Sequence, residues 1–161
     1  MSETDDWQDR IDAVWADDAL SDGERIVRID ALASERAADD AVALFERASA
    51  RDSAGREGDA EVLYRRALTR GLEGRRRSEA RIQLASTLRN LGQIEESLRI
   101  LDEERRGGEL ADAAAAFYAL ALASSGDPAS AASVALETLA PHLPQYTRSV
   151  AAYARELRAA R

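Results

Sequence analysis

Three glycines divide the chain into segments of similar length, and each stands in the same local pattern. Gly55 precedes Gly92 by 37 residues, and Gly92 precedes Gly126 by 34. Seven residues before each glycine the sequence has an alanine, at Ala48, Ala85 and Ala119. A pattern that recurs at this period indicates tandem units in which one short helix ends at the glycine and a second helix follows. We expect the three glycines to adopt the left-handed conformation, which is costly for other residues.

The residues that follow each glycine continue the pattern. Five residues later the chain has a small side chain, at Ala60, Ser97 and Ala131. Together with the alanines before the glycines, these small residues would let the two helices of a unit cross closely. Nine residues after the glycines stand Tyr64, Leu101 and Ala135, which we expect to pack toward the next unit. The pattern therefore predicts an all-α α-solenoid of stacked antiparallel helix pairs.

Start and stop signals along the chain predict nine helices and no strand. The first helix is expected over about 5–17 and the last over about 145–159. Ser21 and Glu24 form a capping-box pattern at the start of the second helix. Further helix caps are predicted at Asp39 or Asp40, at Ser78, and at Asp127 before Pro128. The abundance of alanine and the presence of only three prolines also favour helix over sheet.

This register resembles the tetratricopeptide repeat, most closely in Gly55-Arg-Glu-Gly-Asp-Ala60-Glu-Val-Leu-Tyr64-Arg-Arg-Ala67, Leu84-Ala85-x-x-Leu88 and Gly92-Gln-Ile94-Glu-Glu-Ser97. The resemblance covers three units, 41–74, 78–111 and 112–145. It implies a right-handed superhelix in a single domain, 1–161, with a degenerate N-terminal helical pair at 5–36 and a capping helix at 145–159. Within the family, the chain is similar to a bacterial group with divergent repeats. It departs from the usual pattern at Arg47, Arg51 and Ala135, where apolar, aromatic and large residues are common.

The charge distribution bears on the class of partner. The net charge is −8, and residues 1–40 carry 13 acidic residues against four arginines. An acidic protein repels phosphate backbones, so we expect no nucleic-acid partner. Arg75, Arg76 and Arg77 are interpreted as part of a solvated loop. The sequence has no cysteine, no long apolar run and an acidic N-terminus, from which we expect a cytoplasmic protein without a membrane contact.

Catalytic and metal-binding patterns are missing from the sequence. His142 is the only histidine and stands between Pro141 and Pro144, which suits a loop residue better than a general base. The pairs of neighbouring aspartates suit helix N-termini rather than a calcium loop. No glycine motif has the phosphate-binding pattern. We therefore predict no catalytic residue, no metal site, no cofactor and no enzymatic activity.

In tandem helical repeats the first helix of each pair lines the concave side of the superhelix. Here that face is predicted to bind a partner protein or peptide through Phe45, Ser49, Asp52, Ile82, Ser86, Arg89, Asn90 and Leu120. The family resemblance implies a groove that can grip a carboxylate, but the chain has no lysine and only Arg89 and Asn90 could serve. An apolar peptide or an amphipathic helix is the better match.

Three alternatives stay open at this point. The last helix, 145–159, could fold back over Leu120 and fill the groove itself. The protein could instead be a self-associating structural module, a homodimer with no separate ligand. Trp7 and Trp15 share one helix face, which is interpreted as packing on the following helix pair, with a subunit interface as the sharper hypothesis.

Overall fold

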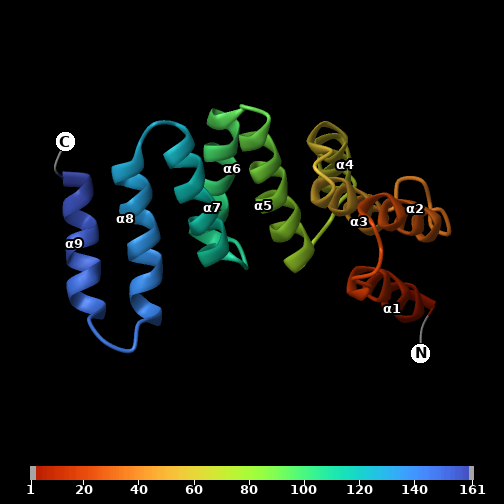
Figure 1. Ribbon diagram of the computed structural model, residues 1–161, viewed down its shortest axis with the longest axis horizontal. Coiled ribbons are helices and arrows are strands. Elements are labelled where there is room, and N and C mark those ends of the chain that lie inside the picture. The colour runs from red at the N-terminus through yellow and green to blue at the C-terminus, as the bar shows by residue number, and fades with distance from the viewer. Residues whose placement is uncertain (1–2, 160–161) are drawn as a thin grey trace. The chain divides into compact units, whose positions relative to one another are not determined.

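The structure is a computed structural model that describes residues 3–159. These residues form nine α-helices and one short 3-10 helix, with no strand among them (Figure 1). Each helix packs mainly on its neighbours in the chain: α2 on α3, α3 on α4, α6 on α7, α7 on α8 and α8 on α9. Packing between consecutive helices is the arrangement of a helical-repeat solenoid, so the predicted fold class is confirmed.

The chain divides into two compact units, and the boundary falls inside α5, between Thr87 and Leu88. The helices of the first unit are α1 (Glu3–Ala16), α2 (Asp22–Ala33), α3 (Ala41–Ser53), α4 (Glu57–Thr69) and most of α5 (Gly74–Asn90). The second unit contains the end of α5 followed by α6 (Ile94–Gly107), α7 (Ala111–Ser124), α8 (Pro128–Leu139), the 3-10 helix η1 (Ala140–His142) and α9 (Thr147–Ala159). The predicted repeat boundaries stay predictions.

Local hydrogen bonds start several of these helices as the sequence predicts. The Ser21 hydroxyl accepts from the Glu24 backbone N–H at 3.3 Å, and the Glu24 carboxylate accepts from the Ser21 backbone N–H at 3.0 Å. This completes the capping box of α2. The carboxylates of Asp40 and Asp127 accept backbone N–H groups at the starts of α3 and α8. Each cap satisfies a donor that the helix itself leaves unpaired.

The start of α5 differs from the prediction. The helix begins at Gly74, so Ser78 is a buried residue inside it and not its N-cap. Arg75, Arg76 and Arg77 therefore lie in the first turn of a helix rather than in a loop. Two of them have partners that explain the extension, one within α5 and one in α1. Arg75 pairs with Glu79 four residues on at 2.9 Å, and Arg76 donates to the Gln8 side chain of α1 at 2.8 Å.

The left-handed conformation predicted for the three repeating glycines is confirmed at all three positions. Gly55, Gly92 and Gly126 have φ values of 69°, 79° and 86°, the left-handed conformation in which a side chain is strained. The alanines seven residues before them are buried, and so are the small residues five after them. In the second unit, Ala119 of α7 and Ala131 of α8 belong to one core cluster. Small side chains thus meet where the paired helices cross.

The two tryptophans of α1 pack on the helices that follow, which confirms the packing interpretation. Trp7 is buried and its indole nitrogen donates to the Leu32 carbonyl at the end of α2, at 2.8 Å. Ile11 and Val14 complete the buried stripe of α1, against Ile26 and Ile29 of α2. The N-terminal pair is therefore an integral part of the core of the first unit.

Candidate functional site

The predicted groove residues lie on three helices and fall into both units. Phe45, Ser49 and Asp52 belong to α3, and Ile82 and Ser86 to the part of α5 in the first unit. Arg89 and Asn90 end α5, and Leu120 belongs to α7, all in the second unit.

A polar cluster lies between α3, α4 and α5 in the first unit. The Asp52 carboxylate accepts hydrogen bonds from the Thr87 hydroxyl at 3.1 Å and from the Tyr64 hydroxyl at 3.4 Å. The Tyr64 hydroxyl also lies 3.3 Å from the Ser49 hydroxyl. Burial raises the pKa of Asp52, and the two hydrogen bonds only partly offset this. Ser49 and Asp52 are thus half-buried and engaged with other helices of their own unit.

Two apolar residues of the predicted groove are not exposed. Phe45 has 8% of its surface accessible and Ile82 has 4%. The Phe45 ring packs against Tyr64, with ring centroids 6.2 Å apart. The expectation that these side chains form an open apolar row is wrong, because both are buried. Phe45 and Ile82 belong to the core.

The exposed part of the predicted groove lies in the second unit. Leu120 is 48% exposed, so the last helix does not cover it. The same face of α7 presents three further exposed apolar residues, at Ala113, Ala116 and Ala123. Their spacing of three and four residues places them on one stripe of the helix. This stripe carries no charged side chain.

Arg89 is the one cation of the predicted groove. Its Nη2 donates to the Asn90 side chain at 3.3 Å. Its Nε is buried and has no hydrogen-bond partner among the described residues. The buried Nε cannot reach an acceptor on another molecule, so any contact of Arg89 with a partner involves its terminal nitrogens.

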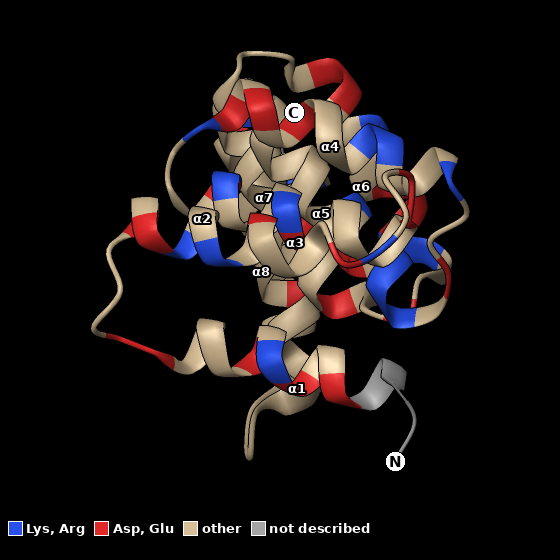
Figure 2. Ribbon diagram, turned by 90° about the vertical axis from the view of Figure 1, so that its right-hand side faces the viewer, with Lys and Arg blue, Asp and Glu red and all other residues tan. Residues whose placement is uncertain are grey.

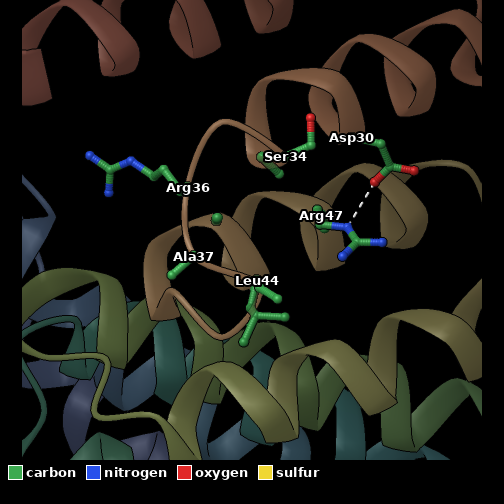
Figure 3. A pocket seen from close by; sticks show the side chains of 9 residues that line it. Asp30, Ser34, Arg36, Ala37, Leu44 and Arg47 are labelled. Carbon is green, nitrogen blue, oxygen red and sulfur yellow. Dashed lines mark hydrogen bonds and ion pairs between the residues drawn. The ribbon is translucent and has the colours of Figure 1, made fainter.

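A separate pocket of about 310 Å³ opens between α2, α3 and their connecting loop. Figure 3 shows Asp30 and Arg47 facing each other at its edge, 2.9 Å apart. Asp30 also pairs with Arg51 at 2.8 Å. Burial opposes ionisation of Asp30, but the two arginines outweigh it and hold the pKa of Asp30 below its ordinary value. The Asp30 carboxylate of α2 is thus satisfied by two arginines of α3, and these ion pairs hold α2 to α3.

Three features bear on other kinds of site. Among residues 3–159, no group of three His, Asp or Glu side chains gathers where it could hold a metal ion. His142 is exposed, and its Nε2 lies 3.0 Å from the carboxylate of Asp112. No helix in the described part of the chain combines the length and the hydropathy needed to cross a membrane.

Sequence reasoning missed two features. The buried carboxylate of Glu46 accepts a hydrogen bond from the indole nitrogen of Trp15. Nothing in the sequence around Glu46 distinguishes it from a solvent-exposed glutamate of a helix. Tyr153 and Leu157 of α9 are exposed, although the sequence places them on the apolar stripe of a capping helix. The signal for the second feature is the recurrence of Val150, Tyr153 and Leu157 at helical spacing.

Comparison with protein families gives one match. The family model described as Tetratrico peptide repeat matches residues 41–157, which is most of the chain. No curated protein and no solved structure matches the sequence.

Proposed function

The chain belongs to the tetratricopeptide repeat family, and on that premise we propose that it is a non-enzymatic adaptor that binds a peptide or an amphipathic helix of another protein. Repeats of this family mediate protein–protein interaction. The binding surface in this proposal lies in the second unit, on the exposed face of α7, with Leu120 as its apolar centre. The predicted groove is revised accordingly, without Phe45 and Ile82 as contact residues.

One observation carries the proposal: the uncharged stripe of Ala113, Ala116, Leu120 and Ala123 is open to solvent on α7. A helix in a repeat stack normally buries one stripe against its partner helix and a second against its neighbours, and it presents polar residues elsewhere. Small residues around one leucine form a shallow surface on which the apolar face of another helix can lie closely.

In this proposal, Arg89 supplies the polar contact of the binding surface. Its guanidinium group can donate to a carbonyl or a carboxylate of the bound segment, and Asn90 is exposed beside it. Ser49 and Asp52 hydrogen-bond within the first unit, so neither they nor the half-buried Ser86 belong to the proposed surface. The net negative charge supports a protein partner over nucleic acid. Cytoplasmic location stays part of the proposal, supported by the absence of cysteine.

A library of displayed peptides tests this function and requires no identified partner. Selection on the full chain should enrich peptides with apolar residues at helical spacing. Leu120→Arg should weaken their binding by at least about tenfold, because it places a charge at the centre of the contact. Val62→Arg is the matched control, since Val62 is exposed on α4, the second helix of its pair, and does not belong to the proposed surface. Enriched peptides that bind Leu120→Arg as well as the original chain would refute the proposed surface.

A second candidate function is self-association, as a structural module or homodimer. The exposed stripe of α9 favours it, and the surface involved is different from that of α7.

A further inference from the structure

The last helix carries positive charge that no ion pair offsets. Arg148 and Arg155 of α9 are exposed, and neither has an ion pair within the described residues 3–159. They stand seven residues apart, which places them two turns apart on one side of the helix. The third arginine of α9, Arg158, pairs with Glu137 of α8. Two cations on one side of α9 are therefore available to a bound molecule.

The acidic groups near these arginines do not neutralise them. Glu156 is the single acidic residue between Thr147 and Ala159, and as the direct neighbour of Arg155 it points to a different side of the helix. The carboxylate of Asp112 lies 3.0 Å from His142 instead. The main excess of acid belongs to residues 1–40, with 13 acidic residues and four arginines, and red segments mark acidic positions on α1 in Figure 2.

The repeat register relates the two arginines to the open stripe of α7. Residues of α9 stand 35 positions after residues of α7 in three pairs: Ala113 and Arg148, Ala119 and Ala154, Leu120 and Arg155. The alanine pair is buried in both helices, and the other two pairs are exposed in both. The family match reaches residue 157, so α9 is the first helix of a further unit. Equivalent positions of successive units lie on the same face of a solenoid.

Packing within the second unit agrees with this relation. Both α7 and α9 pack on α8, and they run in the same direction in Figure 1. The contact of His142 with Asp112 joins the segment that enters α9 to the first turn of α7. Arg148 and Arg155 thus extend the face of the Leu120 stripe onto the next first helix. This face has an apolar part on α7 and a basic part on α9.

We propose that the segment bound on the α7 stripe is an acidic amphipathic helix, whose apolar residues contact Leu120 and whose carboxylates pair with Arg148 and Arg155. The inference rests on the proposed function and adds the charge of the partner to it. Arginine presents forked donors that match a carboxylate. Two turns of helix separate the arginines by about 10 Å, so two acidic residues seven positions apart on the bound helix match their spacing.

Other helices fit this face less well. A basic amphipathic helix could cover Leu120, but it would bring like charges together at Arg148 and Arg155. An uncharged helix would leave both arginines without a partner where they border the contact. Repulsion of the wrong partner and attraction of the right one both contribute to specificity, so the basic part of the face selects among apolar helices.

Peptides selected from a displayed library on the full chain test the inference. The enriched sequences should combine apolar residues at helical spacing with Asp or Glu along one edge. Each enriched peptide is then synthesised in two forms, with its acidic residues kept or changed to the matching amide. The acidic form should bind the original chain about fivefold more tightly or better. About 1 M salt should remove most of this advantage, since it screens exposed charges.

Charge reversal in the protein identifies the groups responsible. Arg155→Glu should weaken the acidic form by about tenfold and leave the amide form nearly unchanged. A third form of the peptide, with Lys at the acidic positions, should bind Arg155→Glu more tightly than it binds the original chain. Arg148→Glu repeats the test at the other end of the basic part. The matched control is Arg77→Glu, which changes the net charge equally at an exposed arginine of the first unit and should not alter the affinity.

The two proposals fail in different ways. Peptides that lose affinity on Leu120→Arg but bind equally well in the acidic and amide forms overturn this inference and leave the peptide-binding function standing. The same holds if Arg155→Glu and Arg77→Glu have equal effects, because the preference for acid is then a property of the overall charge. Peptides that depend on Arg155 but bind Leu120→Arg unchanged overturn both proposals. Circular dichroism melting checks that each variant is folded, and the comparison of peptide forms on the original chain requires no variant.

Discussion

The indole nitrogen of Trp15 in α1 donates a hydrogen bond to the carboxylate of Glu46 in α3, over 2.9 Å. Glu46 is only 5% exposed, and burial raises its pKa despite the Trp15 hydrogen bond and the nearby charge of Arg76. One buried acid thus holds the N-terminal helix against the first complete helix pair. Its ionisation bears on the stability of the whole first unit.

The raised pKa gives a signed pH dependence. The folded protein holds the Glu46 proton to higher pH than the unfolded chain, whose ordinary value is 4.5. Between these two pKa values the folded state binds more protons, so the contribution of Glu46 to the free energy of unfolding falls as pH rises. Glu46→Gln cannot ionise and can still accept from Trp15. We expect the stability of the variant relative to the original chain to increase from about pH 5 to about pH 7, in urea unfolding.

Glu73→Gln is the control for this measurement, since Glu73 is an exposed carboxylate in the same unit. A stability difference between Glu46→Gln and the original chain that is the same at both pH values would contradict a raised pKa for Glu46.

The order of the helices and the spacing of the repeating glycines could be predicted from the sequence, because interactions between neighbouring residues determine them. The capping box at Ser21 and the left-handed Gly92 each depend on a few neighbouring residues. The start of α5 was misplaced because Arg76 bonds to Gln8, a residue far away in the sequence. The local signal of Ser78 could not reveal that contact.

Exposure was harder to predict than secondary structure. The spacing of residues within one helix predicts which of them share a face. Whether other helices cover that face depends on tertiary packing, which the spacing does not determine. Ile82 and Leu120 were assigned to the same kind of surface, yet Ile82 is buried and Leu120 is open. The buried Glu46 was missed for the same reason, because its partner Trp15 belongs to another helix pair.

The crossing alanine of α5 provides a test of the register. Ala85 is fully buried, so Ala85→Leu adds three carbons where no space exists. We expect a loss of about 1–3 kcal/mol in the free energy of unfolding. Ala132→Leu on the exposed face of α8 is the matched control, with little expected change. Equal stability of Ala85→Leu and the control would mean that the helices do not cross at Ala85.

The cap of α8 provides a second test. Asp127 accepts the Ser130 backbone N–H at 3.0 Å, immediately before Pro128 in the first turn. Asp127→Ala removes this acceptor and should cost about 1 kcal/mol, measured by thermal unfolding. Asp127→Ser should recover most of the loss, because serine can cap in the same position. A serine variant no more stable than the alanine variant would show that capping is not the role of Asp127.

The contrast between Ile82 and Leu120 gives the last prediction, since one substitution has opposite consequences at the two positions. Ile82→Arg places a charge in the core without a partner, and we expect it to cost more than about 3 kcal/mol and to unfold much of the protein at room temperature. Leu120→Arg changes a half-exposed side chain whose guanidinium can reach water, and it should alter the free energy of unfolding by less than about 0.5 kcal/mol. Circular dichroism during urea unfolding measures both. If Ile82→Arg is as stable as Leu120→Arg, then α5 is open where the structure has it covered, and Ile82 returns to the binding surface. If Leu120→Arg is instead the unstable variant, the stripe of α7 is part of the core, and the peptide-binding proposal loses its centre.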